Sequence, residues 1–121
     1  MAKTVLTVDD SRTMREMLRL ALTAEGYRVV QAEDGLHGLE VLSDEAPDVI
    51  VTDINMPRMD GFGFIEEVRG DPRYRGLPIL VLTTESDEAK KTRARMAGAT
   101  GWIVKPFNPA KLADAIRRVA A

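Results

Sequence analysis

Polar and charged side chains stand where several short apolar runs of this sequence end. In chain order they are Asp9, Asp10, Asp53, Thr83 and Lys105. An aspartate loses favourable hydration on burial, so an aspartate that ends an apolar run needs an explanation. Taken singly, each residue has an ordinary one, because an aspartate can cap a helix, a threonine can lie in a turn, and a lysine can be a solvated surface cation. Their joint occurrence at the ends of strands in one sheet favours a functional site.

Three clustered carboxylates would need a cation. Two carboxylates about 5 Å apart repel by roughly 3 kcal/mol at an effective dielectric constant of about 20. An all-oxygen set of ligands suits Mg²⁺ better than zinc, which prefers histidine or cysteine. The single histidine of the chain, His37, lies in a predicted helix away from this edge.

The same residues could receive a phosphoryl group. A carboxylate is a nucleophile toward phosphorus, so Asp53 could form an aspartyl phosphate. The transfer requires that charge on the phosphoryl oxygens be neutralised. Mg²⁺ could bind one oxygen, the Lys105 ammonium a second, and the Thr83 hydroxyl with a backbone N–H the third. Thr84 is a further candidate for phosphoryl binding, although both threonines could be turn hydroxyls.

Apolar, β-branched runs alternate with helical patterns along the whole chain. We expect strands at Thr4–Val8, Arg28–Ala32, Val49–Thr52, Ile79–Leu82 and Gly101–Val104. The first, third and fourth runs are nearly continuous in apolar residues, which is typical of parallel strands covered on both faces.

The segments between these runs predict five helices. The first has an apolar stripe at helical spacing, which comprises Met14, Met17, Leu18, Ala21 and Leu22. The others are expected from about Gly35 to Glu45, from near Gly61, from Ser86–Glu88 to Gly98, and from Pro109 after the N-cap Asn108. Five strand–helix units predict an α/β, flavodoxin-like (βα)5 fold, with a doubly wound five-stranded parallel sheet in a single domain. In such a sheet the loops after the strands open on one edge, where ligands bind.

Composition excludes several classes of function. The chain has 121 residues, of which 45% are hydrophobic, and this fits one domain over residues 1–121 with no output domain. The absence of cysteine excludes disulfides and thiolate metal sites and favours a cytoplasmic location. The net charge of −2 argues against nucleic acid or an anionic membrane as a partner. The first apolar run is too short for a signal peptide or a membrane span, and we expect a monomer.

Six motifs occur in a characteristic order: Val8–Ser11, Asp53–Pro57, Met59–Gly61, Thr83, Ala97–Ala99 and Lys105–Phe107. With these motifs the chain resembles the receiver domains of response regulators, in particular the CheY-like chemotaxis proteins, over essentially its full length. The resemblance implies a single-domain response regulator of a two-component system, a phosphoprotein in which Asp53 accepts a phosphoryl group from a chemotaxis-type histidine kinase. Such a protein is not an enzyme in the usual sense, because it catalyses only its own phosphorylation and dephosphorylation.

The resemblance also implies roles for the individual site residues. The Mg²⁺ ligands would be Asp10, Asp53 and the main-chain carbonyl of Asn55, with Asp9 assisting through water. Thr83 and Lys105 would bind the phosphoryl group, and the peptide bond after Lys105 would be cis, which a bond to proline permits at little cost. Asn55 and Glu85 occupy the positions at which such domains tune dephosphorylation.

A conformational switch is a further implication of the resemblance. Thr83 would move toward the phosphoryl group, and an aromatic residue on the fifth strand, here Trp102 in place of the usual tyrosine, would turn inward. An indole is larger than a phenol and donates only through its N–H, so any contact made by a tyrosine hydroxyl must differ here. Trp102 could instead be a fixed, half-buried core residue. The surface of the fourth helix, fifth strand and fifth helix would be the partner face.

The implied output is control of flagellar rotation through a flagellar motor switch protein, and a phosphatase is a further expected type of partner. A phosphate sink or phosphorelay carrier would use the same chemistry with a different output. The chain also begins its first helix with Arg12, Met14 and Arg15, which could contact a kinase or phosphatase. Equally, the arginines could be solvated and Met14 could belong to the core.

Other classes of protein fit the residues less well. A phosphatase of the haloacid dehalogenase type needs a second aspartate two residues after its nucleophile, where this chain has Asn55. A binding module unable to be phosphorylated is disfavoured because every member of the acidic set, the threonine and the lysine are present. FMN binding would need a Gly- or Ser-rich phosphate loop after the first strand, which the sequence lacks.

Overall fold

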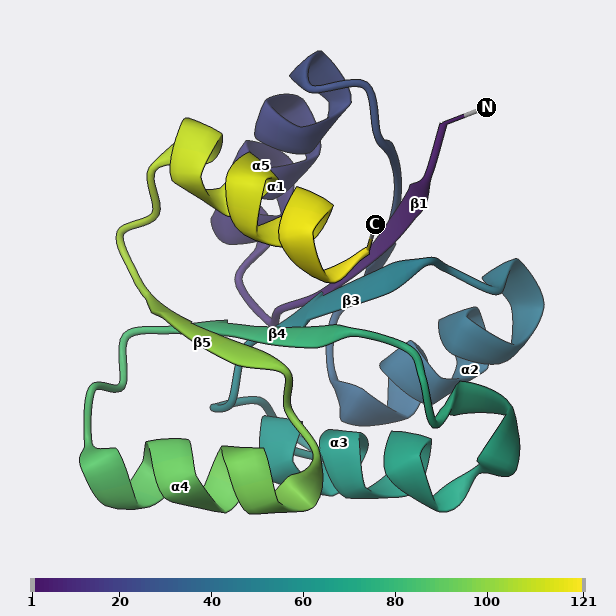
Figure 1. Cartoon of the computed structure of the whole chain (residues 1–121), viewed down its shortest axis with the longest axis vertical. Helices are drawn as coiled ribbons and strands as arrows, with labels where there is room; N and C mark the ends of the chain where they lie inside the picture. Colours follow the sequence, from purple (N-terminus) through teal and green to yellow (C-terminus); the bar gives the residue numbers. More distant parts are fainter. Residues whose placement is uncertain (1, 121) are drawn as a thin grey trace.

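Five parallel strands form one sheet with helices on both faces (Figure 1) in the computed structural model, which describes residues 2–120. The strands are β1 (Thr4–Val8), β2 (Arg28–Ala32), β3 (Val49–Thr52), β4 (Ile79–Thr83) and β5 (Gly101–Val104). Their order in the sheet is β2-β1-β3-β4-β5, and each neighbouring pair is parallel. The predicted flavodoxin-like, doubly wound sheet is therefore confirmed. The strand order reverses between β1 and β3, which places the switch point at the carboxyl ends of these two strands.

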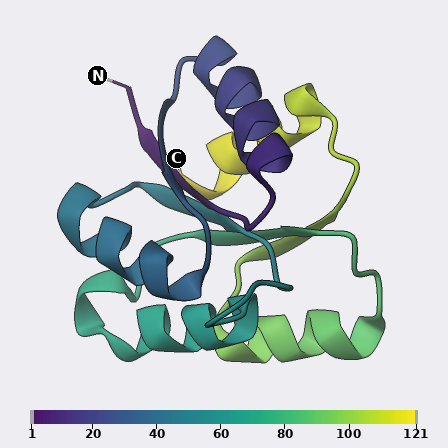
Figure 2. The same ribbon diagram turned by 180° about the vertical axis from the view of Figure 1, so that it is seen from behind.

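The helices form two layers, with α1 and α5 on one face of the sheet and α2, α3 and α4 on the other (Figures 1 and 2). Their bounds are Arg12–Ala24 for α1, Gly35–Glu45 for α2, Gly61–Gly70 for α3, Glu88–Ala97 for α4 and Pro109–Val119 for α5. Each begins after a residue whose side chain accepts a backbone N–H, and these N-caps are Ser11, Asp34, Asp60, Asp87 and Asn108. The helix starts thus follow from local side-chain chemistry. A short 3-10 helix at Pro72–Tyr74, which the sequence patterns did not predict, follows α3.

Apolar side chains pack on both faces of the sheet, because successive residues of each strand point to opposite faces. Leu6 and Val8 belong to the cluster under α2, α3 and α4, and Val5 belongs to the cluster under α1 and α5. Among the described residues, no helix combines the length and the apolar character that a membrane crossing requires.

Two expectations require correction. Met17, expected in the buried stripe of α1, is 50% exposed, because Leu18 and Leu22 supply the contacts with the sheet and Met17 lies about 100° away around the helix. The fourth strand extends one residue further than predicted, to Thr83, which pairs with Val104 of β5. This extension holds Thr83 rigidly at the edge where the other polar residues gather.

Thr7 offers a stability prediction. It is fully buried on β1, and its hydroxyl has no hydrogen-bond partner among the described residues. Thr7→Val keeps the branched shape and removes the desolvated hydroxyl, so we expect the free energy of unfolding to rise by about 1 kcal/mol. Urea denaturation would measure it, with Thr7→Ser, which keeps the hydroxyl and loses the methyl group, as the destabilised control. An unchanged or lower midpoint for Thr7→Val would show that the hydroxyl is hydrogen-bonded in solution.

Candidate functional site

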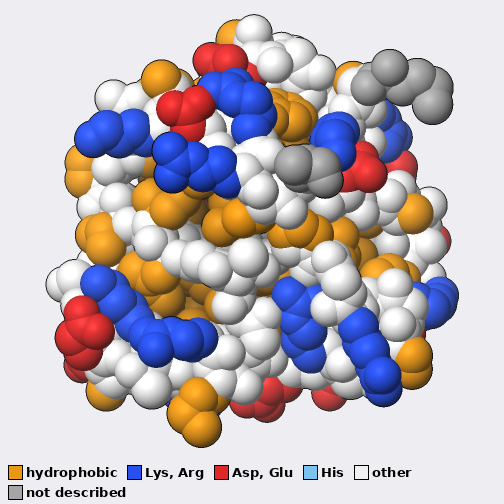
Figure 3. Space-filling view, in the orientation of Figure 1, with side chains coloured by type: hydrophobic (Ala, Val, Ile, Leu, Met, Phe, Trp, Pro, Cys, Tyr) orange, Lys and Arg blue, Asp and Glu red, His pale blue; other side chains and the backbone are white. Residues whose placement is uncertain are grey.

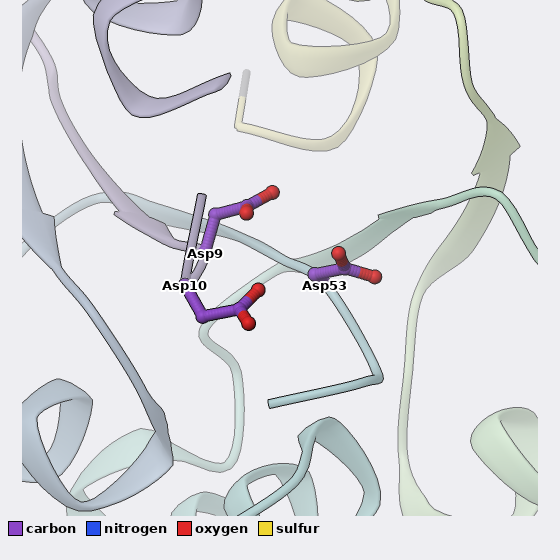
Figure 4. Close-up of side chains that lie close together, drawn as sticks. All are labelled: Asp9, Asp10 and Asp53. Carbon is purple, nitrogen blue, oxygen red and sulfur yellow. The ribbon is translucent and has the colours of Figure 1, made fainter. Parts of the chain in front are cut away.

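Three carboxylates meet where β1 and β3 end. Asp53 donates its backbone N–H to the Val8 carbonyl at 2.9 Å, so the two strands remain paired up to the acidic residues. Asp9, Asp10 and Asp53 each offer a carboxylate oxygen within 4.8 Å of the others. Figure 4 shows Asp9 and Asp10 on adjacent positions with Asp53 beside them. Asp9 and Asp53 are buried, whereas Asp10 is exposed. The predicted acidic cluster is present, and it is open to solvent at Asp10.

Lys105 is the cation of this cluster. Its Nζ donates to Asp9 Oδ2 and to Asp53 Oδ2, both at 2.9 Å. The side chains of Lys105, Asp9 and Asp53 are 9%, 3% and 11% exposed, so Lys105 is not a solvated surface lysine. The peptide bond between Lys105 and Pro106 is cis, as expected. Three carboxylates and one ammonium leave a formal charge of −2, which a divalent cation would neutralise.

Burial and ion pairing shift the proton affinities of the paired groups. Burial raises the pKa of Asp9, although hydrogen bonds from Lys105 and from the Ser11 N–H act in the opposite direction. Burial alone would lower the pKa of Lys105, but its hydrogen bonds to Asp9 and Asp53 and their negative charges raise it above the usual value. Lys105 therefore stays protonated at neutral pH, and its charge compensates the negative charges of the buried Asp9 and Asp53 carboxylates.

The chemistry of the donors fits Mg²⁺. The candidate ligands are all oxygens, from Asp10, from Asp53 and from the main-chain carbonyl of Asn55, with no histidine or cysteine among them. The Asn55 carbonyl accepts no hydrogen bond within residues 2–120, so it is free to bind a cation. Asp53 is oriented by its own hydrogen bonds, since Oδ1 accepts the Ile54 N–H at 2.6 Å and Oδ2 accepts Lys105. Exposed Asp10 leaves room for the water ligands that Mg²⁺ usually retains.

The two threonines differ in their surroundings. Thr83 is fully buried, and its hydroxyl accepts the Glu85 N–H in a long hydrogen bond of 3.4 Å. It is not hydrogen-bonded to Asp53. Thr84 is exposed, and its hydroxyl makes no hydrogen bond to the described part of the chain. Of the two, only Thr83 is held by the sheet.

Glu85, in the loop between β4 and α4, is hydrogen-bonded both to Asn55, two residues after Asp53, and to Trp102. Its carboxylate accepts the Asn55 side-chain amide at 3.0 Å and lies 3.1 Å from Lys90 Nζ. The hydrogen bond from Asn55, followed by that from Lys90, lowers the pKa of Glu85. The main-chain carbonyl of Glu85 accepts the indole N–H of half-buried Trp102 at 3.0 Å. One loop residue thus contacts both a position expected to tune dephosphorylation and the expected switch residue.

Three contacts were not anticipated. Arg15 donates to the main-chain carbonyl of Asp9 at 2.7 Å, so it is not simply solvated, whereas Arg12 is exposed. Asp9, which we expect to assist Mg²⁺ through water, is also hydrogen-bonded directly to Lys105. Asp34 forms an ion pair with Arg58, 24 residues later, and no sequence motif marks this pair. Only the left-handed backbone at Arg58, with φ of 64°, hints at an unusual position, and that is visible only in the structure.

Comparison with known proteins gives a consistent result. Residues 5–117 match the model of the response regulator receiver domain family. The chain is 40% identical over 117 residues to the chemotaxis protein CheY1 of Helicobacter pylori, an alignment that covers 95% of this chain and 94% of that protein. The structure of the chemotaxis protein CheY4 of Vibrio cholerae superposes with a TM-score of 0.94 at 44% identity and covers 98% of this chain and 99% of that one. A longer relative from Guillardia theta, named as a transcriptional regulator, is 41% identical over 115 residues, which are 95% of this chain and 44% of the relative.

Proposed function

This chain belongs to the response regulator receiver domain family, and from that premise we propose that Asp53 accepts a phosphoryl group from a histidine kinase while Mg²⁺ is bound at the acidic cluster. The observation that carries the proposal is the position of Lys105, whose ammonium contacts Asp9 and Asp53 together. With Lys105 in place, the cluster has the formal charge of −2 that one Mg²⁺ would balance.

The proposed chemistry follows from the side chains in place. Asp10, Asp53 and the Asn55 carbonyl would hold Mg²⁺, with Asp9 available through water. Bound Mg²⁺ would supply neutralisation of one phosphoryl oxygen. A bond forms between a carboxylate oxygen of Asp53 and phosphorus as the P–N bond of the kinase phosphohistidine breaks, and the imidazole nitrogen keeps the electron pair. The Lys105 ammonium, already 2.9 Å from Asp53, would then neutralise a second oxygen.

Thr83 is proposed to complete the site. Its hydroxyl accepts a long hydrogen bond from the Glu85 N–H, and its proton is available to donate to a phosphoryl oxygen. Movement of Thr83 toward that oxygen would disturb the loop whose carbonyl binds the Trp102 indole. Asn55 and Glu85, which are hydrogen-bonded to each other, would control how water approaches the phosphoryl group.

Phosphoryl uptake in the absence of a kinase is the direct test. Acetyl phosphate with Mg²⁺ should add one phosphoryl group to the intact protein, and EDTA should prevent the addition. A protein that stays unmodified with Mg²⁺, or that is modified equally well in EDTA, would contradict the proposal.

The lone tryptophan provides a prediction about the switch. Beryllofluoride mimics a phosphoryl group in the presence of Mg²⁺. It should change Trp102 fluorescence, because the indole N–H is hydrogen-bonded to Glu85 in the loop that follows Thr83. Asp53→Asn in the same mixture is the matched control and should give no change. Unchanged fluorescence after phosphorylation has been verified by mass would leave Trp102 as a fixed core residue.

The proposed output is phosphorylation-dependent binding to a partner such as a flagellar motor switch protein. In Figure 3, hydrophobic side chains lie over β5 between α4 and α5, with lysine and arginine side chains on either side. A groove of about 500 Å³ there is lined in part by Trp102, Ile103, Val104, Phe107, Lys111 and Leu112. An apolar segment with acidic residues would fit this surface. Pull-down with motor switch protein, with and without beryllofluoride, separates this output from a phosphate sink or phosphorelay carrier, which would bind only histidine-bearing partners.

A further inference from the structure

A carboxylate–guanidinium pair joins the loop after β2 to the loop after β3. Arg58 donates from Nε to Asp34 Oδ2 at 2.7 Å and from Nη2 to Asp34 Oδ1 at 3.1 Å. Two parallel hydrogen bonds fix the relative orientation of the two groups as well as their separation. The Asp34 side chain is only 4% exposed, whereas that of Arg58 is 54% exposed. The arginine therefore covers a buried carboxylate, which distinguishes this pair from two solvated surface charges.

The two loops also touch through their main chains. The Gly35 N–H donates to the Met59 carbonyl at 3.0 Å. A Cβ atom on Gly35 would lie 2.6 Å from Met59 Cγ, so no side chain fits between the loops. The ion pair and this contact act at neighbouring positions, and together they hold the loop after β3 against the first turn of α2.

The backbone at Arg58 indicates that its side chain has a specific purpose. Its φ of 64° lies in the left-handed region, which glycine and asparagine adopt more readily than arginine. What arginine adds at this position is its two hydrogen bonds to Asp34. The hydrogen bond from Arg58 is also the main reason that the pKa of Asp34 lies below its usual value, so the pair stays ionised at neutral pH.

The position of the pair relates it to the acidic cluster. β1 lies between β2 and β3, so a link between the loops after β2 and β3 spans the carboxyl end of β1, which Asp9 and Asp10 follow. The linked loop contains Asn55, three residues before Arg58. Its near end is fixed by the hydrogen bond from the Gly61 N–H to the Ile54 carbonyl at 2.8 Å. Residues 55–58 are thus held at both ends.

We propose that the Asp34–Arg58 pair is a positioning device for Mg²⁺ binding, which holds the loop after β3, and with it the main-chain carbonyl of Asn55, where the cation needs it. This inference rests on the proposed function, because the cation site is the one through which Asp53 is phosphorylated. Asp34 and Arg58 contact neither the cation nor the phosphoryl group in this arrangement, and they act through the loop.

Two substitutions remove the pair with little disturbance elsewhere. Asp34→Asn keeps a good N-cap for α2, including an oxygen for the His37 N–H, and Arg58→Asn suits the left-handed backbone. Each should weaken Mg²⁺ binding by about tenfold, as loss of outer contacts to a metal site typically does. The double variant should be no weaker than either single variant, because both remove the same contact. Isothermal titration calorimetry with Mg²⁺ alone measures these affinities.

Two further readouts separate positioning from general stability. Hydrogen exchange in residues 55–60 of the metal-free protein should be faster in both variants, with melting temperatures close to that of the wild type. Arg73→Gln breaks the exposed Asp71–Arg73 pair beyond the far end of α3, and this matched control should leave Mg²⁺ affinity and loop exchange unchanged. Arg58→Lys, which keeps the charge, should restore part of the affinity.

The outcomes are distinguishable. Wild-type Mg²⁺ affinity in both variants would overturn the positioning role and leave the proposed function intact. A lower affinity that follows a lower melting temperature in every variant, Arg73→Gln included, would also overturn it. Failure of the wild-type protein to bind Mg²⁺ would contradict the proposed function itself, and this inference with it.

Discussion

Asp53→Asn is expected to abolish phosphoryl uptake from acetyl phosphate and from a histidine kinase. An amide oxygen is a far weaker nucleophile than a carboxylate, so the covalent step has no substitute at this position. The fold should survive, because the asparagine oxygen can still accept the Ile54 N–H, and Lys105 keeps its hydrogen bond to Asp9. The substitution also removes one of three crowded negative charges. We therefore expect the free energy of unfolding either to stay within about 1 kcal/mol of the wild-type value or to exceed it.

Intact mass and urea denaturation measure the two parts of this prediction. Asp71→Asn, a substitution of the same type beyond the far end of α3, is the matched control and should be phosphorylated like the wild type. Phosphoryl uptake by Asp53→Asn at the wild-type level would mean that another residue is the acceptor.

Lys105→Met is expected to destabilise the metal-free protein and to tighten Mg²⁺ binding. The ammonium is the shared partner of Asp9 and Asp53, whose side chains are 3% and 11% exposed. Removal of one partner from a buried ion pair costs about 3–5 kcal/mol, because a charge is left uncompensated. The formal charge of the cluster becomes −3. A unit charge about 4 Å from the bound ion interacts with it by several kcal/mol even at a dielectric constant of about 20, so Mg²⁺ should bind at least about tenfold more tightly.

The loss of stability in Lys105→Met should depend on pH. Burial already raises the pKa of Asp9 in the folded protein, and loss of Lys105 removes an interaction that opposed this rise. A carboxyl whose pKa is raised on folding favours the fold at pH values below its unfolded pKa, of about 3.9, and this contribution is lost as the pH rises through the folded pKa. The difference between variant and wild type should therefore be small in acid and grow toward neutral pH.

Denaturation with and without Mg²⁺, over a range of pH, tests this prediction. Lys91→Met removes an exposed ion pair with Glu88 on α4 and is the matched control, with an expected loss below about 1 kcal/mol. Weaker Mg²⁺ binding in Lys105→Met than in the wild type would show that the lysine helps to build the cation site rather than competing with it.

Local signals in the sequence predict most of the fold. Asp34 before α2, and Asn108 with Pro109 at the start of α5, mark helix starts through the hydrogen bonds and backbone angles that these residues favour. The acidic cluster is predictable for a different reason, because parallel strands end at a common edge. Asp9 and Asp53 therefore come together once β1 and β3 are recognised as neighbours.

Contacts between distant side chains could not be predicted in this way. The pairing of Asp34 with Arg58 depends on how two loops approach each other across the end of β1, and no periodic pattern encodes it. The exposure of Met17 depends on how α1 is rotated about its axis on the sheet, which a stripe of five apolar positions leaves undetermined. The direct contact of Lys105 with Asp9 likewise depends on side-chain geometry after both strands have ended.

Location of the phosphoryl group is the most direct test of the central claim. The wild-type protein would be incubated with acetyl phosphate and Mg²⁺, digested, and its peptides analysed by tandem mass spectrometry. The spectra would then assign the phosphoryl group to one residue. We expect the adduct on Asp53 and its absence when EDTA replaces Mg²⁺. An adduct on any other residue, or one that forms without Mg²⁺, would contradict the assignment of Asp53 and the acidic cluster as the phosphoryl-accepting site.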